Sequence, residues 1–171
     1  SGLLHINLAR ALGAGKIVAT DLVDYRLQAA KRLGADFAFS ATDDIPARFR
    51  EVNDGRLADL VIVSTGARPA LSQALESVDR GGTVLFFAPT EPGVTVPISI
   101  NDVFFRNDAT LTTTYAAGPG DLATALEMIA SGRAQVGEMI SHRLGLSDTG
   151  LGFKLNAEAA DSLKVVIQPQ K

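Results

Sequence analysis

The chain of 171 residues contains no cysteine, no tryptophan and only two histidines. Without cysteine, it can form no disulfide, no thiolate metal site and no thiol nucleophile. The two histidines, His5 and His142, are too few and too isolated to form a metal site of their own. These absences exclude thiol chemistry and a metal site built from cysteine or histidine within these residues.

Long hydrophobic runs and an excess of positive charge are also missing. No run approaches eighteen apolar residues, and no signal peptide is present, so we expect no membrane segment and a cytoplasmic location. The formal net charge is −3, which argues against nucleic acid as the main partner because a duplex binder needs a basic face. With 46% hydrophobic and 20% charged residues, the length suffices for one full domain core and a small appendage.

The most informative stretch is residues 16–26, KIVATDLVDYR. Its apolar run, residues 17–20, predicts a buried strand, and Asp21 stands at the carboxyl end of that strand, directly before a helical pattern. In an open parallel sheet, ligands lie at the carboxyl ends of the strands, and an acid there can accept both hydroxyl protons of an adenosine ribose. Asp21 is therefore the first candidate for a cofactor contact. The alternative is that it only caps the following helix.

A glycine upstream favours the cofactor interpretation. Gly2 begins a predicted helix with Leu4, Leu8 and Leu12 on one face, and it precedes Asp21 by 21 − 2 = 19 residues. In a dinucleotide fingerprint, G-x-G-x-x-G, the third glycine lets the helix pack on the sheet, and the ribose acid follows about twenty residues later. We therefore expect the chain to begin inside its phosphate-binding loop, with the first two glycines and the first strand before residue 1.

Helical and strand patterns alternate after Asp21. They predict, in order, a helix over 24–34, a strand over 36–39, a helix over 44–52, a strand over 58–63, a helix over 69–78, a glycine turn at 81–82 and a strand over 83–88. This alternation predicts a right-handed doubly wound parallel sheet. The segments 64–66 and 87–89 would then lie at the same ligand-facing edge as Asp21.

The next segment predicts a subunit contact. Residues 94–100, VTVPISI, alternate in polarity around a proline, which predicts an edge strand. A threonine-rich strand over 109–116 follows a short apolar segment that contains Phe104 and Phe105. An edge strand beside exposed phenylalanines predicts a homo-oligomer through residues 94–116. The alternative is that both phenylalanines are buried within their own domain.

A glycine- and proline-rich break at 117–120 divides the chain. It predicts a dinucleotide-binding domain over residues 1–117 and a separate carboxyl-terminal α+β segment over residues 118–171. Within that segment we expect a helix over 121–131 with Leu122, Leu126 and Ile129 inside, a strand over 139–144, a helix over 149–157 and a last strand over 163–167.

The sequence resembles the coenzyme-binding half of a medium-chain zinc-containing alcohol or polyol dehydrogenase. The resemblance covers nearly the whole chain and rests on the runs SGLLHINLARALGAGKIVATDLVDYRLQAAKRLGAD, ADLVIVSTG, GGTVLFFAP and MISHRLGLSDTGLGFKLNAEAADSLKVVI. It implies a Rossmann-type doubly wound sheet that lacks its first strand, followed by a return into the catalytic domain. The parent protein would oxidise an alcohol or polyol by hydride transfer to NAD.

The resemblance also implies roles for individual residues. Gly2 would be the last fingerprint glycine, with the pyrophosphate at the positive end of its helix. Asp21 would hold the adenosine ribose and favour NAD over NADP, because its carboxylate repels a 2′-phosphate, and Arg26 would lie nearby. The other implied contacts are Ser64 and Thr65 at the adenine ribose, Phe87, Pro89, Thr114 and Ala116 around the nicotinamide, and Lys164 at the pyrophosphate. The resemblance gives His142 a structural role.

The catalytic zinc would be held by the amino-terminal half of such a dehydrogenase, so these residues are expected to bind no metal and to be inactive alone. Three alternatives stay open: a zinc-independent NADPH quinone or enoyl reductase, a methyltransferase that uses S-adenosylmethionine, and a non-catalytic nucleotide-sensing or dimerisation module. A short-chain dehydrogenase is excluded, because neither Tyr25 nor Tyr115 has a lysine four residues later.

Overall fold

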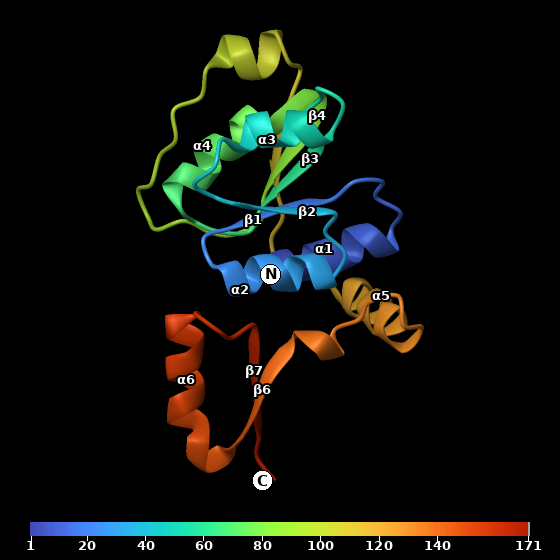
Figure 1. Ribbon diagram of the computed structural model, residues 1–171, viewed down its shortest axis with the longest axis vertical. Helices are drawn as coiled ribbons and strands as arrows, with labels where there is room; N and C mark the ends of the chain where they lie inside the picture. Colours follow the sequence, from blue (N-terminus) through green and yellow to red (C-terminus); the bar gives the residue numbers. More distant parts are fainter. Residues whose placement is uncertain (171) are drawn as a thin grey trace. The chain divides into compact units, whose positions relative to one another are not determined.

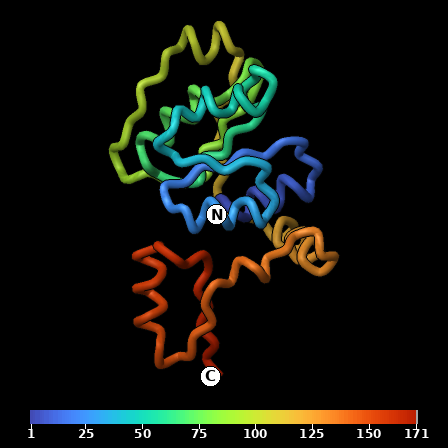
Figure 2. The backbone as a smooth tube through the Cα atoms, viewed as in Figure 1, coloured from blue at the N-terminus to red at the C-terminus, as the bar shows by residue number. Residues whose placement is uncertain are grey.

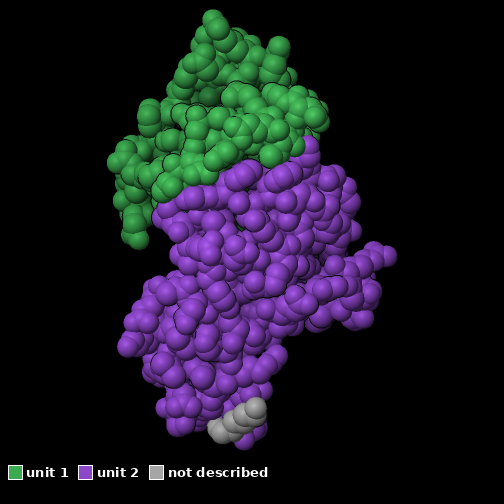
Figure 3. All heavy atoms as spheres, in the orientation of Figure 1, with its two compact units in different colours: residues 1–5, 41–118 green, residues 6–40, 119–171 purple. Residues whose placement is uncertain are grey.

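The computed structural model describes residues 1–170 as an α/β protein with parallel sheets (Figure 1), which confirms the predicted fold class. The chain forms two compact units (Figure 3). The first unit contains Ser1–His5 and Ala41–Gly118, and the second contains Ile6–Ser40 and the segment from Pro119 onward. The predicted domain division between residues 117 and 118 stays a prediction.

A three-stranded parallel sheet forms the centre of the first unit. Its strands lie in the order β3 (Ala58–Val63), β4 (Val78–Phe86) and β5 (Thr110–Thr113). The strand β3 has the predicted bounds, and its apolar run ends at the polar residues Ser64 and Thr65. The helix α3 (Ile45–Val52) precedes it, and α4 (Arg68–Ser77) connects it to β4, as a parallel crossover requires.

The core of this unit lies between the sheet and α4. Val84, in the middle of β4, is completely buried. The other members of the cluster are Val63, Leu71, Ala74, Val78, Val103 and Ala109. Because these side chains come from β3, α4, β4 and the segment before β5, their packing fixes the carboxyl ends of neighbouring strands relative to one another.

The glycine turn predicted before β4 lies inside that strand. Between the pairs Ala58–Val78 and Leu60–Thr83, β4 advances 83 − 78 = 5 residues while β3 advances 60 − 58 = 2. The extra residues form a bulge, in which Gly81 has a φ of +72°. Glycine adopts this left-handed conformation without a Cβ clash. The two glycines that suggested a turn therefore form a bulge within a longer strand.

The edge strand predicted over residues 94–100 is wrong, because residues 94–99 run as a loop (Figure 2) and Ile100 already has helical structure. Its proline, Pro97, has no N–H to donate to a sheet. Val94 and Val96 instead pack against the core of the first unit. The alternating pattern that suggested a strand therefore reflects two valines that contact the core from an irregular segment.

The apolar segment after this loop forms a π-helical turn, Asn101–Phe105. Val103 is buried there, whereas Phe105 is 85% exposed. The next strand, β5, is an edge strand of the three-stranded sheet. An exposed phenylalanine therefore does precede an edge strand, but the homo-oligomer contact through residues 94–116 stays a prediction.

In the second unit, β1 (Val18–Asp21) pairs in parallel with β2 (Phe37–Ser40), and α2 (Asp24–Arg32) connects them. Ala29 and Ala30 of α2 are nearly completely buried. Small side chains on this face allow the helix to lie close to the strands it connects. The helix α1 (Gly2–Ala11) begins in the first unit and continues in the second.

The carboxyl-terminal part of the second unit contains α5 (Pro119–Ala130) and a parallel βαβ arrangement. In that arrangement, β6 (Ile140–Gly145) pairs with β7 (Lys164–Gln168), and α6 (Thr149–Glu158) connects them. Short 3₁₀ turns, Gly137–Met139 and Leu146–Asp148, precede and follow β6. All three predicted elements of this βαβ arrangement are therefore confirmed. Among residues 1–170, no helix combines the length and the apolar character needed to span a bilayer.

The helix α5 differs from its prediction in two respects. It begins two residues early, at Pro119, because proline is well suited to the first turn of a helix. Leu122, Leu126 and Ile129, predicted to point inside, are 60%, 67% and 43% exposed. The three residues do lie on a helix as predicted, but no described part of the chain covers the face that they form. The same holds for Leu4, Leu8 and Leu12 of α1, which are also exposed.

Candidate functional site

Asp21 is the last residue of β1, and its carboxylate organises the turn into α2. One oxygen, Oδ1, accepts the N–H of Val23 at 2.9 Å, and the other, Oδ2, lies 4.0 Å from Nη1 of Arg26. The first residue of α2 is Asp24, and the capping residue, Val23, has no side-chain hydrogen bond. Asp21 therefore does not cap α2 in the usual way, and its Oδ2 can accept hydrogen bonds from a ligand.

Gly2, at the start of α1, lies against the end of β3. A Cβ atom at this position would be 2.8 Å from Oγ of Ser64, closer than real Cβ atoms come. This close approach is what a fingerprint glycine provides at the start of a helix. The first backbone N–H groups of α1 have no partner within the helix and carry its positive dipole end, so they suit an anionic group.

The segments that follow β3 and β4 lie against each other. The N–H groups of Phe87 and Ala88 both donate to the carbonyl oxygen of Val63, each at 3.1 Å. A Cβ atom at Gly66 would overlap the carbonyl oxygen of Pro89. The structure therefore brings together the predicted site segments 64–66 and 87–89, at the carboxyl ends of two neighbouring strands. Nearby, Oγ1 of Thr65 accepts the N–H of Ala67 at 3.3 Å.

A cavity of about 640 Å³ opens beside these segments, at the carboxyl ends of β4 and β5. Three predicted nicotinamide contacts, Phe87, Pro89 and Thr114, line it. Its other walls include Leu71, Val96, Ile98 and Tyr115. A mostly apolar cavity of this size with a few polar groups is typical of a site for a small organic molecule.

Ala116 and Lys164 are the predicted contacts that no described interaction connects with the others. Ala116 is exposed after β5 and has a φ of +60°, while Lys164 is exposed at the start of β7 in the second unit. Asp21 and Arg26 belong to the second unit, whereas Ser64, Thr65 and Phe87 belong to the first. The cofactor roles assigned to all ten residues stay predictions.

His5 is a candidate site residue that the sequence reasoning did not assign. Its ring contacts that of Phe87 edge to face, with 4.4 Å between the centroids and 81° between the planes. Its Nδ1 is buried and has no hydrogen-bond partner among the described residues. The signal was its spacing, because a residue three positions after Gly2 lies on the same face of α1. His5 therefore supports Phe87 at the wall of the cavity.

The environment of His5 predicts a loss of stability in acid. Burial lowers the pKa of His5 from its ordinary value of 6.5, and the nearby positive amino group of the chain lowers it further. As the pH falls below about 6.5, His5 gains a proton in the unfolded chain before it does so in the folded one, so the free energy of unfolding falls. We expect His5→Gln to show a shallower decline between pH 7 and pH 5 in urea denaturation. Equal pH slopes for wild type and variant would contradict this prediction.

Residues 1–170 contain no group of three or more histidine, cysteine, aspartate or glutamate side chains that could hold a metal ion. His142 has its Nδ1 3.0 Å from Oγ of its neighbour Ser141 on β6. The described residues therefore do not fit a zinc ion. A dinucleotide does fit individual features: the close approach at Gly2, the open oxygen of Asp21 and the apolar cavity beside Phe87.

Comparison with known proteins gives a match to one family. A family model described as zinc-binding dehydrogenase matches residues 2–131. This range includes the first unit almost entirely and all of β1, α2 and β2 in the second. The match therefore covers every predicted cofactor contact except Lys164.

Individual relatives support the same grouping. The chain is 34% identical to L-threonine 3-dehydrogenase of Bacillus velezensis, covering 90% of this chain and 44% of that protein. It is 29% identical to D-xylulose reductase A of Aspergillus oryzae, covering 97% and 47%. The crystal structure of an alcohol dehydrogenase from Thermus sp. ATN1 matches with a TM-score of 0.83 and 31% identity, covering 97% and 48%. The chain thus spans about half the length of the curated relatives it matches.

Proposed function

The chain belongs to the zinc-binding dehydrogenase family, and from this premise we propose that it is the NAD-binding half of an enzyme that oxidises an alcohol or polyol. The bound nicotinamide would accept a hydride from the alcohol carbon. Relatives are named L-threonine 3-dehydrogenase and D-xylulose reductase A, so we propose that the substrate carries a hydroxyl group. A cytoplasmic, homo-oligomeric protein is part of the same proposal.

The carboxylate of Asp21 carries the proposal. It stands at the carboxyl end of a parallel strand, it is held in place by the N–H of Val23, and its Oδ2 makes no hydrogen bond with a described residue. A ribose offers two neighbouring hydroxyl donors, and a carboxylate can accept both of them. The negative charge also disfavours a 2′-phosphate, so NAD is the expected cofactor rather than NADP.

Two further features of the chain suit the remaining parts of NAD. The start of α1, where Gly2 allows the helix to approach Ser64, presents backbone N–H groups suited to the pyrophosphate. The cavity beside Phe87 and Pro89 has flat apolar walls for a nicotinamide ring, and Thr114 adds a hydroxyl. These residues bind and orient the cofactor. The described residues do not fit zinc, so we assign no step to a metal here.

The proposal is tested by titrating the chain with NADH, NADPH and S-adenosylmethionine, with binding followed by calorimetry and NADH fluorescence. We expect saturable binding of NADH, weaker binding of NADPH and no binding of S-adenosylmethionine. Tighter binding of NADPH than of NADH would favour the quinone or enoyl reductase alternative. Binding of S-adenosylmethionine alone, or of none of the three, would overturn the proposal.

A further inference from the structure

A second cavity lies in the second unit, and no residue assigned to NAD lines it. Its volume is about 240 Å³, and α1, the end of α2 and the loop after α5 all contribute to it. The polar side chains that line it are those of Asn7, Arg10, Arg32, Arg133 and Gln135. Three of these five are arginines and none is acidic, so the lining carries a concentrated positive charge.

The positive charge of one of the three arginines is already balanced by a carboxylate. Arg10 donates from Nη2 to Oδ2 of Asp36 at 2.7 Å and to the carbonyl oxygen of Gly34 at 2.8 Å. It also donates from Nη1 to the carbonyl oxygen of Ala14 at 3.2 Å. These bonds attach α1 to the segment before β2. Arg10 therefore has a structural role and a carboxylate partner of its own.

The other two arginines have no such partner. Arg32, in the last turn of α2, and Arg133, after α5, are exposed and form no ion pair or side-chain hydrogen bond within residues 1–170. Guanidinium groups that share a cavity repel each other unless an anion lies between them. The planar fork of arginine matches the oxygen atoms of phosphate and carboxylate groups. The pair is therefore suited to an oxyanion that carries up to two negative charges.

Asn7 provides an independent observation. It lines the same cavity and is only 9% exposed. Its Oδ1 accepts the N–H of Gln135 at 3.0 Å, which fixes the amide with Oδ1 toward that loop. Its Nδ2 makes no hydrogen bond with any residue in the described chain. The amide group lies in the cavity lining with a donor that is free to bind an oxyanion there.

We propose that this cavity binds the phosphate or carboxylate group of a small molecule, held by Arg32, Arg133 and Nδ2 of Asn7. The site is distinct from the predicted NAD contact in the same unit. Gly34 of the cavity precedes β2, whereas Asp21 ends β1, and the two strands are parallel. The cavity therefore lies at the amino ends of these strands, opposite Asp21. The proposal does not depend on the proposed function.

The first test is calorimetric titration of the chain with inorganic phosphate and with citrate, at constant ionic strength set by sodium chloride. We expect saturable binding of at least one of them to the wild type. The double variant Arg32→Gln/Arg133→Gln is expected to bind at least tenfold more weakly, because two charge-assisted contacts are lost. Tighter binding of phosphate than of citrate would indicate a phosphorylated ligand, and the reverse order a carboxylate ligand.

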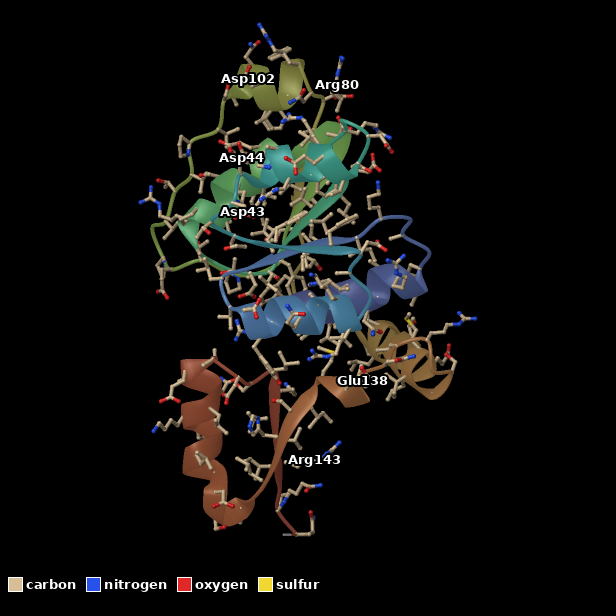
Figure 4. The ribbon with its side chains drawn as sticks, viewed as in Figure 1. Asp43, Asp44, Arg80, Asp102, Glu138 and Arg143 are labelled. Carbon is tan, nitrogen blue, oxygen red and sulfur yellow. The ribbon has the colours of Figure 1, made fainter. Side chains whose placement is uncertain are left out.

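The matched control is Arg143→Gln, which removes one positive charge from β6 in the same unit (Figure 4). This control should bind like the wild type. Asn7→Asp keeps the acceptor for Gln135 but replaces the free donor with a negative charge, so it should also weaken binding at least tenfold. NADH titration of each variant shows whether the dinucleotide site is intact. No saturable binding by the wild type, or equal binding by the double variant, would overturn the proposal.

Discussion

Replacing Asp21 by asparagine is expected to weaken NADH binding by about 10- to 100-fold, because hydrogen bonds to a charged group contribute about 1.5–3 kcal/mol. Asparagine can still accept the N–H of Val23, which the carboxylate binds at 2.9 Å, so the turn into α2 should persist. What is lost is the second charged acceptor for the ribose hydroxyls. The variant therefore separates the ligand contact from the structural one.

The same change should alter cofactor selectivity. Without the carboxylate, a 2′-phosphate is no longer repelled, and Arg26, whose Nη1 lies 4.0 Å from Oδ2 of Asp21, becomes available to pair with it. We expect the ratio of NADH to NADPH affinity to fall to about one. The double variant Asp21→Asn/Arg26→Gln should lose the gain in NADPH binding while NADH binding stays weak.

The measurement is the affinity of each variant for both cofactors, obtained by fluorescence titration. The matched control is Asp24→Asn, because Asp24 is an exposed acid three residues later in the first turn of α2 and makes no described side-chain contact. The control should keep the selectivity of the wild type. If Asp21→Asn and Asp24→Asn change the two affinities equally, Asp21 is not the ribose contact.

The elements that the sequence predicted well are those determined by local patterns. The bounds of β3 were predicted to the residue, because its continuous apolar run, residues 60–63, is typical of a buried strand and ends at Ser64. The helix predicted over 44–52 is α3, which begins at Ile45, and Oδ1 of its capping residue Asp44 accepts the N–H of Ala47 at 3.0 Å (Figure 4). Such signals act within one turn or one strand.

The features that the sequence did not predict depend on contacts between distant segments. Alternation over 94–100 did not reveal that Val94 and Val96 reach the core without a strand. The helical spacing of apolar residues in α5 predicted a buried face, but Leu122 on that face is exposed among the described residues. At the candidate site, the edge-to-face contact between His5 and Phe87 joins residues that are 87 − 5 = 82 positions apart. Local patterns cannot specify such pairings, because they contain no information about which faces meet.

Gly66→Ala is expected to lower the free energy of unfolding by about 1–3 kcal/mol, the usual cost of forcing extra atoms into a packed region. The new Cβ would overlap the carbonyl oxygen of Pro89 and lie 3.2 Å from Cα of Thr90. Both neighbours are backbone atoms, so no flexible side chain can rotate away. The segment that follows β4 must move instead, and urea denaturation should show a lower midpoint with an unchanged slope.

That movement should also weaken NADH binding, because Pro89 and Thr90 line the cavity beside Phe87. The matched control is Gly150→Ala in α6, where an added Cβ has no atom within 4 Å. In a helix, this control should be neutral or stabilise by up to about 1 kcal/mol. Equal stability of the two variants would mean that the segments after β3 and β4 are not packed as described. If Gly66→Ala is destabilised but binds NADH with normal affinity, the cavity beside Phe87 is not part of the cofactor site.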